Sequence, residues 1–260
     1  PRIKNDAVVF EDNGLTDERL REIEHIHIIG CGSALHAGMV GKRVIEAMCR
    51  IRCTAEVASE FRYENPIIGK KDMCIVISQS GETADTLAAM RLAKQAGAFT
   101  IAIVNVVSST IAREADGVLY TWAGPEISVA TTKAYSAQLS ALYLISVKIA
   151  RVRGLISIGD ERALCAELQR LPECIEQTLK CQSDMQRIAT LYANRSSVFF
   201  LGRGLDYAAA LEASLKLKEI SYIHSEAYAA GELKHGTISL IEEGTLVVAL
   251  ATQPALFEKT

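Results

Sequence analysis

The strongest constraint on the fold is a pattern that occurs twice along the chain. The stretch IIGCGSALHAG, which begins at Ile28, corresponds to FLGRGLDYAAA, which begins at Phe200. The matches that follow without a gap are Gly30 with Gly202, Gly32 with Gly204, Ala55 with Ala227, Ala58 with Ala230, Glu60 with Glu232, and the apolar run 75–77 with 247–249. Similarity sustained over two strands and the helix between them indicates a duplicated domain.

Within the first copy, short apolar runs alternate with helical patterns. The predicted strands are HIHIIG (25–30), DMCIVIS (72–78), AFTIAIV (98–104) and GVLYTW (117–122), and the predicted helices cover 34–50, 84–97, 108–116 and 131–153. Thr131 or Thr132 can cap the last helix. This alternation predicts an α/β protein with parallel sheets. We expect two Rossmann-like, three-layer α/β/α domains.

The second copy is truncated, because the strand at 98–104 would map beyond Thr260. The predicted organisation is a first domain at 1–155, a helical connector at 156–195 and an incomplete second domain at 196–260. Within the connector, Pro172 is expected to separate two helices. The chain is therefore expected to be a fragment of a longer protein.

Composition excludes several classes of protein. The net charge is −3 and the seven cysteines are scattered along the chain. Clustered Lys and Arg, which binding to nucleic acid or to an anionic membrane requires, are missing, and so is a membrane-spanning apolar run. Scattered cysteines without C-x-x-C spacing predict free thiols and a cytoplasmic protein.

The loop after the strand at 72–78 predicts a phosphate site. It carries small hydrogen-bond donors at Ser78, Gln79, Ser80 and Thr83 and leads into a helix. A helix N-terminus at the carboxyl edge of a parallel sheet offers free N–H groups and a partial positive charge. These features suit a phosphate, although the loop is not a P-loop. The alternative is that Ser80 is an ordinary N-cap.

A second turn, GCGSALHAG (30–38), joins a strand to a helix. A dinucleotide fingerprint would need a third glycine where Leu35 stands, so this interpretation is disfavoured. The alternative is that Cys31, Gly32 and Ser33 approach a ligand shared with the phosphate loop. A nucleophilic role for Cys31 is disfavoured, because the sequence places no histidine beside it and buried thiols are ordinarily inert.

The second copy carries a charged stripe on an apolar helix. Glu212, Lys216 and Glu219 stand at i, i+4 and i+7 and share one face. A solvated, salt-bridged stripe is the common explanation. On a mostly buried helix, however, such a stripe must line something wet or charged, and a carboxylate beside an amine suits proton transfer. His235 is a candidate second acid–base group, with a structural role as the alternative.

These motifs bring out a family resemblance over nearly the whole chain from His25. The pieces that carry it are SQSGETADT (78–86), EISVATTKA (126–134) and LKLKEISYIHSEAYAAGELKHG (215–236). They resemble the isomerase part, made of two sugar isomerase (SIS) domains, of the glutamine–fructose-6-phosphate aminotransferase family. The resemblance implies synthesis of glucosamine 6-phosphate from fructose 6-phosphate and glutamine, with no metal or organic cofactor.

The resemblance also implies roles for single residues. Ser78, Gln79, Ser80 and Thr83 would bind the phosphate of fructose 6-phosphate, Ser33 would align with a hydroxyl residue of the Gly-rich turn, and Val129 and Thr131 would contact the sugar. Glu219 would move a proton between C1 and C2, and Lys216 would support it. His235 would assist ring opening from the partner subunit of a homodimer.

The chain departs from the family pattern in several places. Ser33 and Ala34 stand where the family has Thr-Ser, which removes one hydroxyl, and Thr237 replaces a proline. The family's glutaminase domain and its C-terminal tail, with a lysine that forms an imine, lie outside this sequence. The fragment alone is therefore not expected to complete the synthase reaction.

Two other interpretations stay open. The first is another SIS enzyme, a ketose–aldose isomerase or a deglycase, which would share the phosphate loop but not the set Lys216, Glu219 and His235. The second is a non-catalytic sugar-phosphate sensor, which would carry a helix-turn-helix ahead of the SIS domain.

Overall fold

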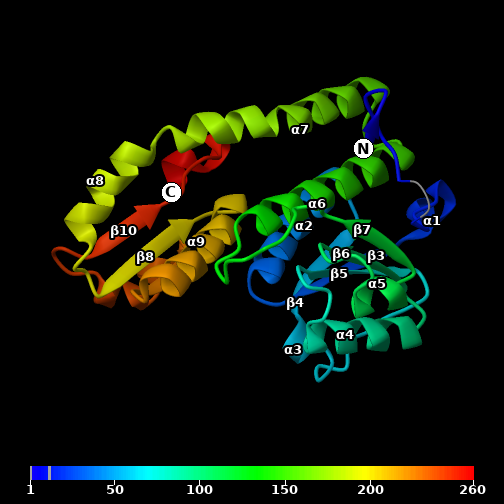
Figure 1. The fold of residues 1–260 in the computed structure, drawn as a ribbon, viewed down its shortest axis with the longest axis horizontal. Helices are drawn as coiled ribbons and strands as arrows, with labels where there is room; N and C mark the ends of the chain where they lie inside the picture. Colours follow the sequence, from blue (N-terminus) through cyan, green and yellow to red (C-terminus); the bar gives the residue numbers. More distant parts are fainter. Residues whose placement is uncertain (1, 11–12) are drawn as a thin grey trace. The chain divides into compact units, whose positions relative to one another are not determined.

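The structure is a computed structural model that describes residues 2–10 and 13–260, and it comprises two compact units, 1–165 and 166–260. Each unit contains a parallel sheet with helices packed on it, which confirms the predicted α/β class (Figure 1). The predicted division at 155 and 196 stays a prediction. Among the described residues, no helix has the length and apolar character needed to cross a membrane.

The first unit is built on a five-stranded parallel sheet with the order β4-β3-β5-β6-β7. Its strands are β3 (His25–Gly30), β4 (Arg52–Val57), β5 (Asp72–Ser78), β6 (Phe99–Val104) and β7 (Gly117–Tyr120). Four of them confirm predicted strands, and β4 was not predicted. A two-stranded antiparallel sheet, β1 (Ile3–Lys4) and β2 (Ala7–Val8), precedes them.

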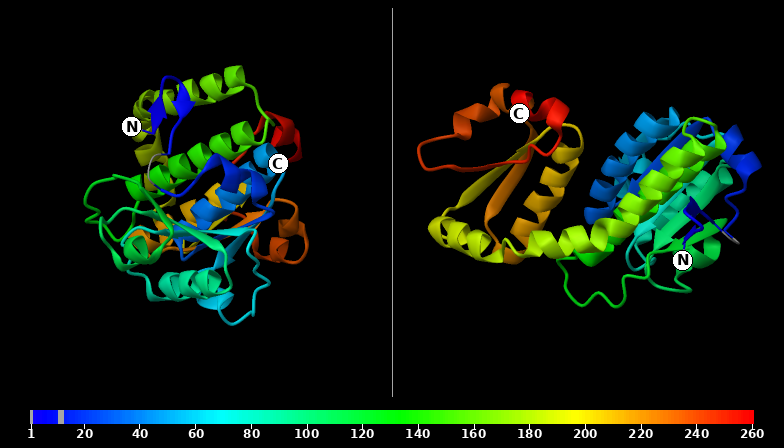
Figure 2. Two further views of the ribbon diagram at one scale, coloured as in Figure 1. Left: turned by 90° about the vertical axis from the view of Figure 1, so that its right-hand side faces the viewer. Right: turned by 90° about the horizontal axis from the view of Figure 1, so that it is seen from above.

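Helices cover both faces of this sheet, which makes the unit three-layered (Figures 1 and 2). Apolar side chains of α2 (Ser33–Cys49) and α6 (Lys133–Val152) pack with Ile28 and Ile75 on one face. On the other face, α3 (Ala58–Phe61), α4 (Ala84–Gln95) and α5 (Thr110–Glu114) pack with Ile29 and Val76. Alternate residues of a strand point to opposite faces, so these continuous apolar runs fill both layers.

At two helix N-termini in the first unit, the structure differs from what the sequence predicts. Thr132 occupies the N-cap position of α6, but its side chain makes no capping hydrogen bond. The short helix α1 (Asp17–Glu22) was not predicted, although the Thr16 hydroxyl accepts a hydrogen bond from the Arg19 N–H there. An N-cap residue is a start signal that sequence inspection can find.

The second unit repeats the start of the first. Its parallel sheet has the order β10-β8-β9, built from β8 (Ser197–Gly202), β9 (His224–Ala229) and β10 (Leu246–Ala249). The helix α9 (Leu205–Ser221) packs on β8 and β9 (Figure 2). Short 3₁₀ helices η1 (Glu232–Lys234), η2 (Thr237–Leu240) and η3 (Pro254–Lys259) complete it.

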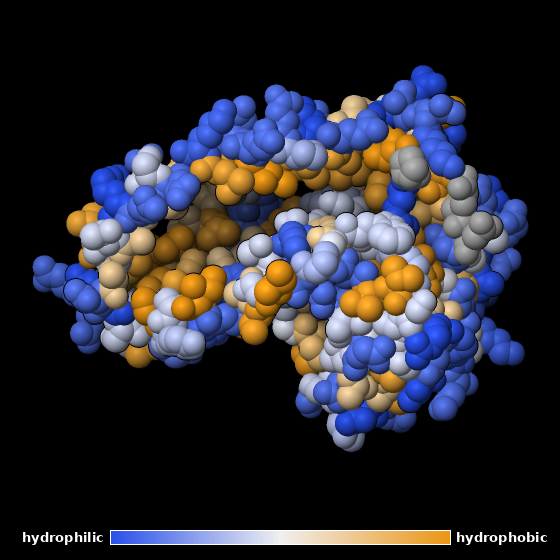
Figure 3. All heavy atoms as spheres, viewed as in Figure 1, coloured by the Kyte–Doolittle hydropathy of each residue, from blue (hydrophilic) through white to orange (hydrophobic). Residues whose placement is uncertain are grey.

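The prediction for Pro172 is wrong, because this residue lies inside α7 (Ile158–Leu179). The break comes later, at 180–181, before α8 (Gln182–Tyr192). A proline leaves the carbonyl four residues earlier without its helical partner. Around Pro172 the helix is exposed, and hydrophilic side chains line one side of α7 in Figure 3. Water can therefore satisfy the freed carbonyl, so the helix continues through the proline.

Candidate functional site

The first unit has a point where the strand order changes direction. The chain runs from β3 to its neighbour β4, and then crosses back over β3 to reach β5 on the other side. In open parallel sheets, ligands bind beyond the carboxyl ends of the strands at such a point. The turn at 31–33 follows β3 and the loop at 79–83 follows β5, so the two predicted ligand segments meet at this edge.

The phosphate loop is held by its own hydroxyl groups. Ser78, the buried last residue of β5, places its Oγ 2.9 Å from Thr83 Oγ1 and accepts a hydrogen bond of 3.0 Å from the Gly81 N–H. Ser80 Oγ accepts from the Glu82 N–H at 3.2 Å. Thr83 is the N-cap residue of α4, so the alternative that Ser80 caps this helix is wrong. The loop thus wraps around the first turn of α4, where N–H groups lack helical partners.

Neighbouring elements fix the loop from outside. The backbone N–H of Asn105 donates to Gln79 O and that of Ile111 donates to Gly81 O, at 3.1 and 3.0 Å. Gly81 has φ +67°, and a Cβ added there would lie 2.0 Å from Ser109 Oγ. Only glycine fits this position, since both the backbone angle and the space exclude a side chain.

The single carboxylate of this loop is directed away from the helix start. Glu82 Oε1 accepts a hydrogen bond of 2.7 Å from the Thr110 N–H at the beginning of α5. This backbone hydrogen bond lowers the pKa of Glu82. The negative charge is therefore held at a second helix N-terminus, where the helix dipole favours it, and the start of α4 is left for an anion.

The turn at 31–33 has a backbone that requires glycine. Gly32 has φ 55° and ψ −127°, angles that residues with a side chain avoid, and it is the N-cap residue of α2. Cys31 is half-buried and its carbonyl accepts from the Ala34 N–H at 3.1 Å. Ser33 is the first residue of α2, so its hydroxyl lies at this carboxyl edge.

Two predicted sugar contacts lie in the segment between β7 and α6. Thr131 Oγ1 donates to Glu126 Oε2 at 2.7 Å, and its N–H donates to Val129 O. The side chain of Val129 is 90% exposed. Because β7 is the far edge strand of the sheet, the strand order does not itself bring these residues to the switch point.

In the second unit, three charged residues of α9 form one cluster. Lys216 Nζ pairs with Glu219 Oε2 and lies 3.7 Å from Glu212 Oε1. Glu212 is 6% exposed, and the Lys216 and Glu219 side chains are 15% and 26% exposed. The solvated-stripe explanation does not fit such low exposure. A positioned carboxylate held by an ammonium can exchange protons with a bound substrate.

His235 is not bonded to this cluster in the structure. It follows η1, its N–H donates to Glu232 O at 2.9 Å, and its side chain is exposed. Among the described residues, no hydrogen bond or ion pair ties its imidazole to Lys216 or Glu219. Because its imidazole is exposed, His235 is accessible to a substrate that is not bound at this cluster.

Sequence reasoning missed two residues that shape the phosphate loop. Ser109 lies against Gly81, is 3% exposed, and its Oγ has no hydrogen-bond partner among the described residues. Asn105 directly follows β6, the strand beside β5, and its Oδ1 accepts hydrogen bonds from Thr121 Oγ1 and the Ala123 N–H. The signal for both is their position, just after β6, where the carboxyl ends of parallel strands gather.

Comparison with known proteins identifies the family of this chain. The SIS domain family matches residues 19–148 and 191–260. A glutamine–fructose-6-phosphate aminotransferase [isomerizing] of Caldanaerobacter subterraneus subsp. tengcongensis is 57% identical over 99% of this chain and 43% of its own length. The enzyme of the same name from Clostridium tetani is 56% identical over 95% of this chain and 40% of its own length. The chain thus spans about two fifths of the curated relatives it matches.

A solved structure is similar over almost the full chain. The C-terminal domain of glucosamine-fructose-6-phosphate aminotransferase from Francisella tularensis superposes with a TM-score of 0.95 and is 36% identical, over 99% of this chain and 72% of that one. This likeness extends over both units.

Proposed function

Since this chain belongs to the SIS domain family, we propose that it is the isomerase part of an enzyme that makes glucosamine 6-phosphate from fructose 6-phosphate and glutamine. The observation that carries the proposal is the hydroxyl-lined loop 78–83 at the switch point of the first sheet. The names of the relatives support the same reaction.

The phosphate of the sugar would bind at the start of α4. Ser78, Gln79, Ser80 and Thr83 would surround it, and Cys31, Gly32 and Ser33 would line the neighbouring side. Three phosphate oxygens need several donors, and hydroxyl groups together with helical N–H groups supply them. Val129 and Thr131 would contact the sugar from the segment before α6.

The isomerisation would use the cluster on α9. Conversion of a ketose to an aldose removes a proton from C1 and returns one to C2, so one carboxylate can serve both steps. Glu219 would be this base, and Lys216 would position it. His235 would assist ring opening from the partner subunit of a homodimer, and ammonia would come from a glutaminase domain elsewhere in the parent protein.

The phosphate assignment is tested by calorimetry with fructose 6-phosphate. Ser80→Ala should weaken binding by about 1–3 kcal/mol, the range for a buried charge-assisted hydrogen bond. The control is Ser140→Ala, because Ser140 Oγ donates to the Ser136 carbonyl of its own helix α6. Equal affinity of both folded variants would refute the phosphate site.

The catalytic assignment is tested in the parent enzyme. Glu219→Gln keeps the side-chain size, and should reduce aldose formation by about 100- to 10,000-fold while glutamine hydrolysis and sugar binding persist. The matched control, Glu243→Gln, alters an exposed carboxylate of the same unit and should leave the rate unchanged. If Glu219→Gln turns over at the wild-type rate, Glu219 is not the base, and another residue must carry this role. Sugar conversion that needs no amine donor would favour the other SIS isomerases.

A further inference from the structure

Two histidines and an aspartate meet at the other edge of the first sheet, where the strands begin. His25 and His27 are alternate residues of β3, so their side chains lie on the same face. Asp72 is the first residue of β5 and pairs with His25 in the strand register. The phosphate loop follows the last residue of β5, so the two places are separated by the length of this strand.

The three side chains are close enough to share one ion. One ligand atom from each of His25, His27 and Asp72 lies within 4.8 Å of the other two. His27 Nε2 is 3.7 Å from Asp72 Oδ2, and the two imidazole rings are 4.1 Å apart between centroids. Two ligands bound to one zinc ion at about 2.0–2.1 Å in tetrahedral geometry are about 3.4 Å apart, so small side-chain rotations suffice.

Both histidines have a buried ring nitrogen without a hydrogen-bond partner among the described residues. His27 is 3% exposed, and the Nε2 atoms of His25 and His27 are buried and unpartnered in the part of the chain that the structure describes. The distance of 3.7 Å between His27 Nε2 and Asp72 Oδ2 is too long for a hydrogen bond. A buried imidazole nitrogen is expensive to leave unsatisfied, and a cation would satisfy it.

The opposite nitrogen of His27 has the partner that metal-binding histidines usually have. His27 Nδ1 lies 3.0 Å from Glu56 Oε1, and Thr54 Oγ1 donates to the same carboxylate oxygen. A carboxylate on one ring nitrogen fixes the tautomer, so that the other nitrogen presents its lone pair. Glu56 belongs to β4, so three neighbouring strands build this arrangement.

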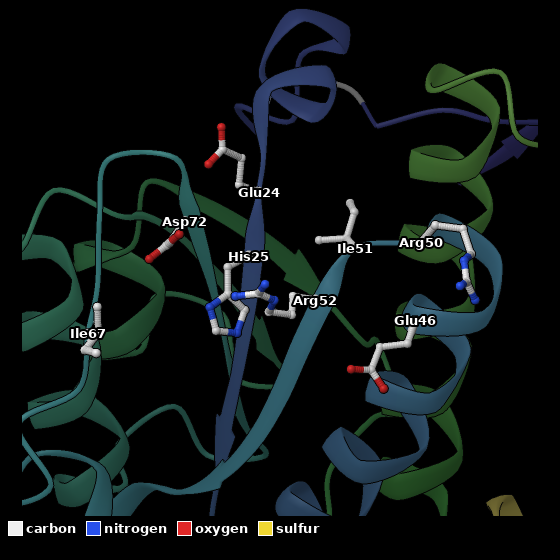
Figure 4. A pocket seen from close by; sticks show the side chains of 8 residues that line it. All are labelled: Glu24, His25, Glu46, Arg50, Ile51, Arg52, Ile67 and Asp72. Carbon is white, nitrogen blue, oxygen red and sulfur yellow. The ribbon is translucent and has the colours of Figure 1, made fainter.

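A pocket gives an ion access to the cluster. It has a volume of about 780 Å³, and its lining includes His25 and Asp72 as well as Glu24, Glu46 and Arg52 (Figure 4). His27, which is almost fully buried, is not among the residues that line the pocket. The pocket side is left for a water ligand. Arg52 acts against a cation, whereas the carboxylates of Glu56 and Asp72 act for it.

We propose that His25, His27 and Asp72 form a binding site for a zinc-class divalent cation, which Glu56 supports from the neighbouring strand β4. Two imidazoles and one carboxylate suit Zn²⁺ or Co²⁺, whereas Mg²⁺ and Ca²⁺ select oxygen ligands. The ion would join β3 to β5 at their amino ends, apart from the sugar chemistry. The expectation that the reaction needs no metal is unaffected.

The test is calorimetry with zinc chloride on the tag-free chain after treatment with a chelator. The exposed thiols Cys174 and Cys181 also bind zinc, so both are first replaced by serine. One saturable equivalent of zinc is expected. His25→Gln and Asp72→Asn should each weaken binding by more than about 100-fold, and Glu56→Gln by about 10- to 100-fold.

The matched control is Glu24→Gln, which removes one charge from the same pocket but none of the ligands. The affinity of this variant for zinc should stay within about twofold of wild type, because an exposed charge is screened by solvent and salt. His25 and Asp72 are only partly buried, and circular dichroism will show whether their variants fold. Co²⁺ should give visible d–d absorption without a thiolate charge-transfer band. Absence of saturable zinc binding, or equal binding in the His25→Gln and Asp72→Asn variants, would overturn the proposal.

Discussion

In the parallel sheets of the two units, the first two strands along the chain and the helix between them have the same bounds once the offset between Ile28 and Phe200 is subtracted. β8 coincides with β3, α9 with α2, and β9 with β4, residue for residue. The turns agree in detail, because Gly32 has φ 55° and ψ −127° and Gly204 has φ 56° and ψ −120°. Both helices end at a left-handed residue, Arg50 or Tyr222.

The helices α2 and α9 have the same backbone bounds, but at three corresponding positions α2 has apolar side chains and α9 has charged ones. The buried Val40 and Val44 of α2 correspond to Glu212 and Lys216 of α9, and Ala47 corresponds to Glu219. Glycine placement and apolar spacing therefore determine the backbone. The first unit forms the same backbone without these charges, which is what a functional site on a duplicated scaffold would look like.

The largest effect should come from breaking the charged cluster on α9. Lys216→Val removes the ammonium beside the buried Glu212, and an uncompensated buried charge costs about 3–5 kcal/mol. The triple variant Glu212→Val, Lys216→Val, Glu219→Ala restores the residue types of α2 and should recover wild-type stability or exceed it. Hydrogen exchange of the α9 backbone amides measures the free energy of unfolding of this helix in each of the two variants.

This pair of variants can contradict the comparison directly. If the triple variant is as unstable as Lys216→Val, the charges are part of the packing of α9 and the two helices are not equivalent. Under our interpretation the triple variant keeps its fold and loses the proposed proton transfer.

A smaller, pH-dependent effect on stability should distinguish the turn after β8 from the corresponding turn after β3. Asp206 is 5% exposed and accepts hydrogen bonds from Thr252 N–H at 2.9 Å and Thr252 Oγ1 at 2.5 Å, whereas Ala34 stands at this position in the first unit. Burial alone would raise the pKa of Asp206, but hydrogen bonds from Thr252 and Gln253 outweigh it and lower the pKa. Asp206→Asn should therefore destabilise the second unit by about 1.5 kcal/mol at pH 7.

The sign of the pH dependence follows from the lowered pKa. The stabilisation by Asp206 is complete above the ordinary aspartate pKa of about 3.9 and is lost as the pH falls through the folded-state value. The deficit of Asp206→Asn should shrink below about pH 4. Urea unfolding at several pH values, with Ala34→Ser as the control in the first unit, checks this. A deficit that stays constant down to pH 2 would exclude ionisation as its cause.

The smallest effect concerns the two helix ends. Arg50 (φ 51°, ψ 34°) and Tyr222 (φ 60°, ψ 8°) both adopt left-handed angles, which cost a residue with a side chain about 1 kcal/mol. Arg50→Gly and Tyr222→Gly should each stabilise their unit by about 0.5–1 kcal/mol. Thermal unfolding should give equal gains. A gain in one unit and a loss in the other would show that the caps are held by different surroundings.

Much of this could be predicted from sequence, for identifiable reasons. Strands β3 and β5 are largely apolar runs between turn residues, so their bounds were predicted correctly. The edge strand β4 was missed, because its sequence RCTAEV mixes polar and apolar residues. For the loop 78–83, residue types alone led to the proposal of a phosphate ligand, which stays a prediction.

The rest depends on contacts that only the folded chain defines. His27 and Asp72 are far apart in the sequence, and strand register alone brings them together. At Pro172 the sequence alone did not show that the surrounding helix is exposed, so that water can satisfy the freed carbonyl. Glu212, Lys216 and Glu219 could be placed on one face from their spacing, but their low exposure could not be inferred.

The parallel sheets also set an order of events during synthesis. β8 pairs with β10, whose last residue is Ala249, whereas the first unit is already complete at Cys165. At translation rates of about 5–20 residues per second, synthesis of the stretch between these two residues takes roughly 4 to 17 s. The ribosome thus delivers a first unit that can fold while the second is still being made, and β8 keeps one unpaired edge until β10 has been synthesised. Chaperone dependence should therefore concentrate on the second copy of the repeat, although both copies share one backbone plan.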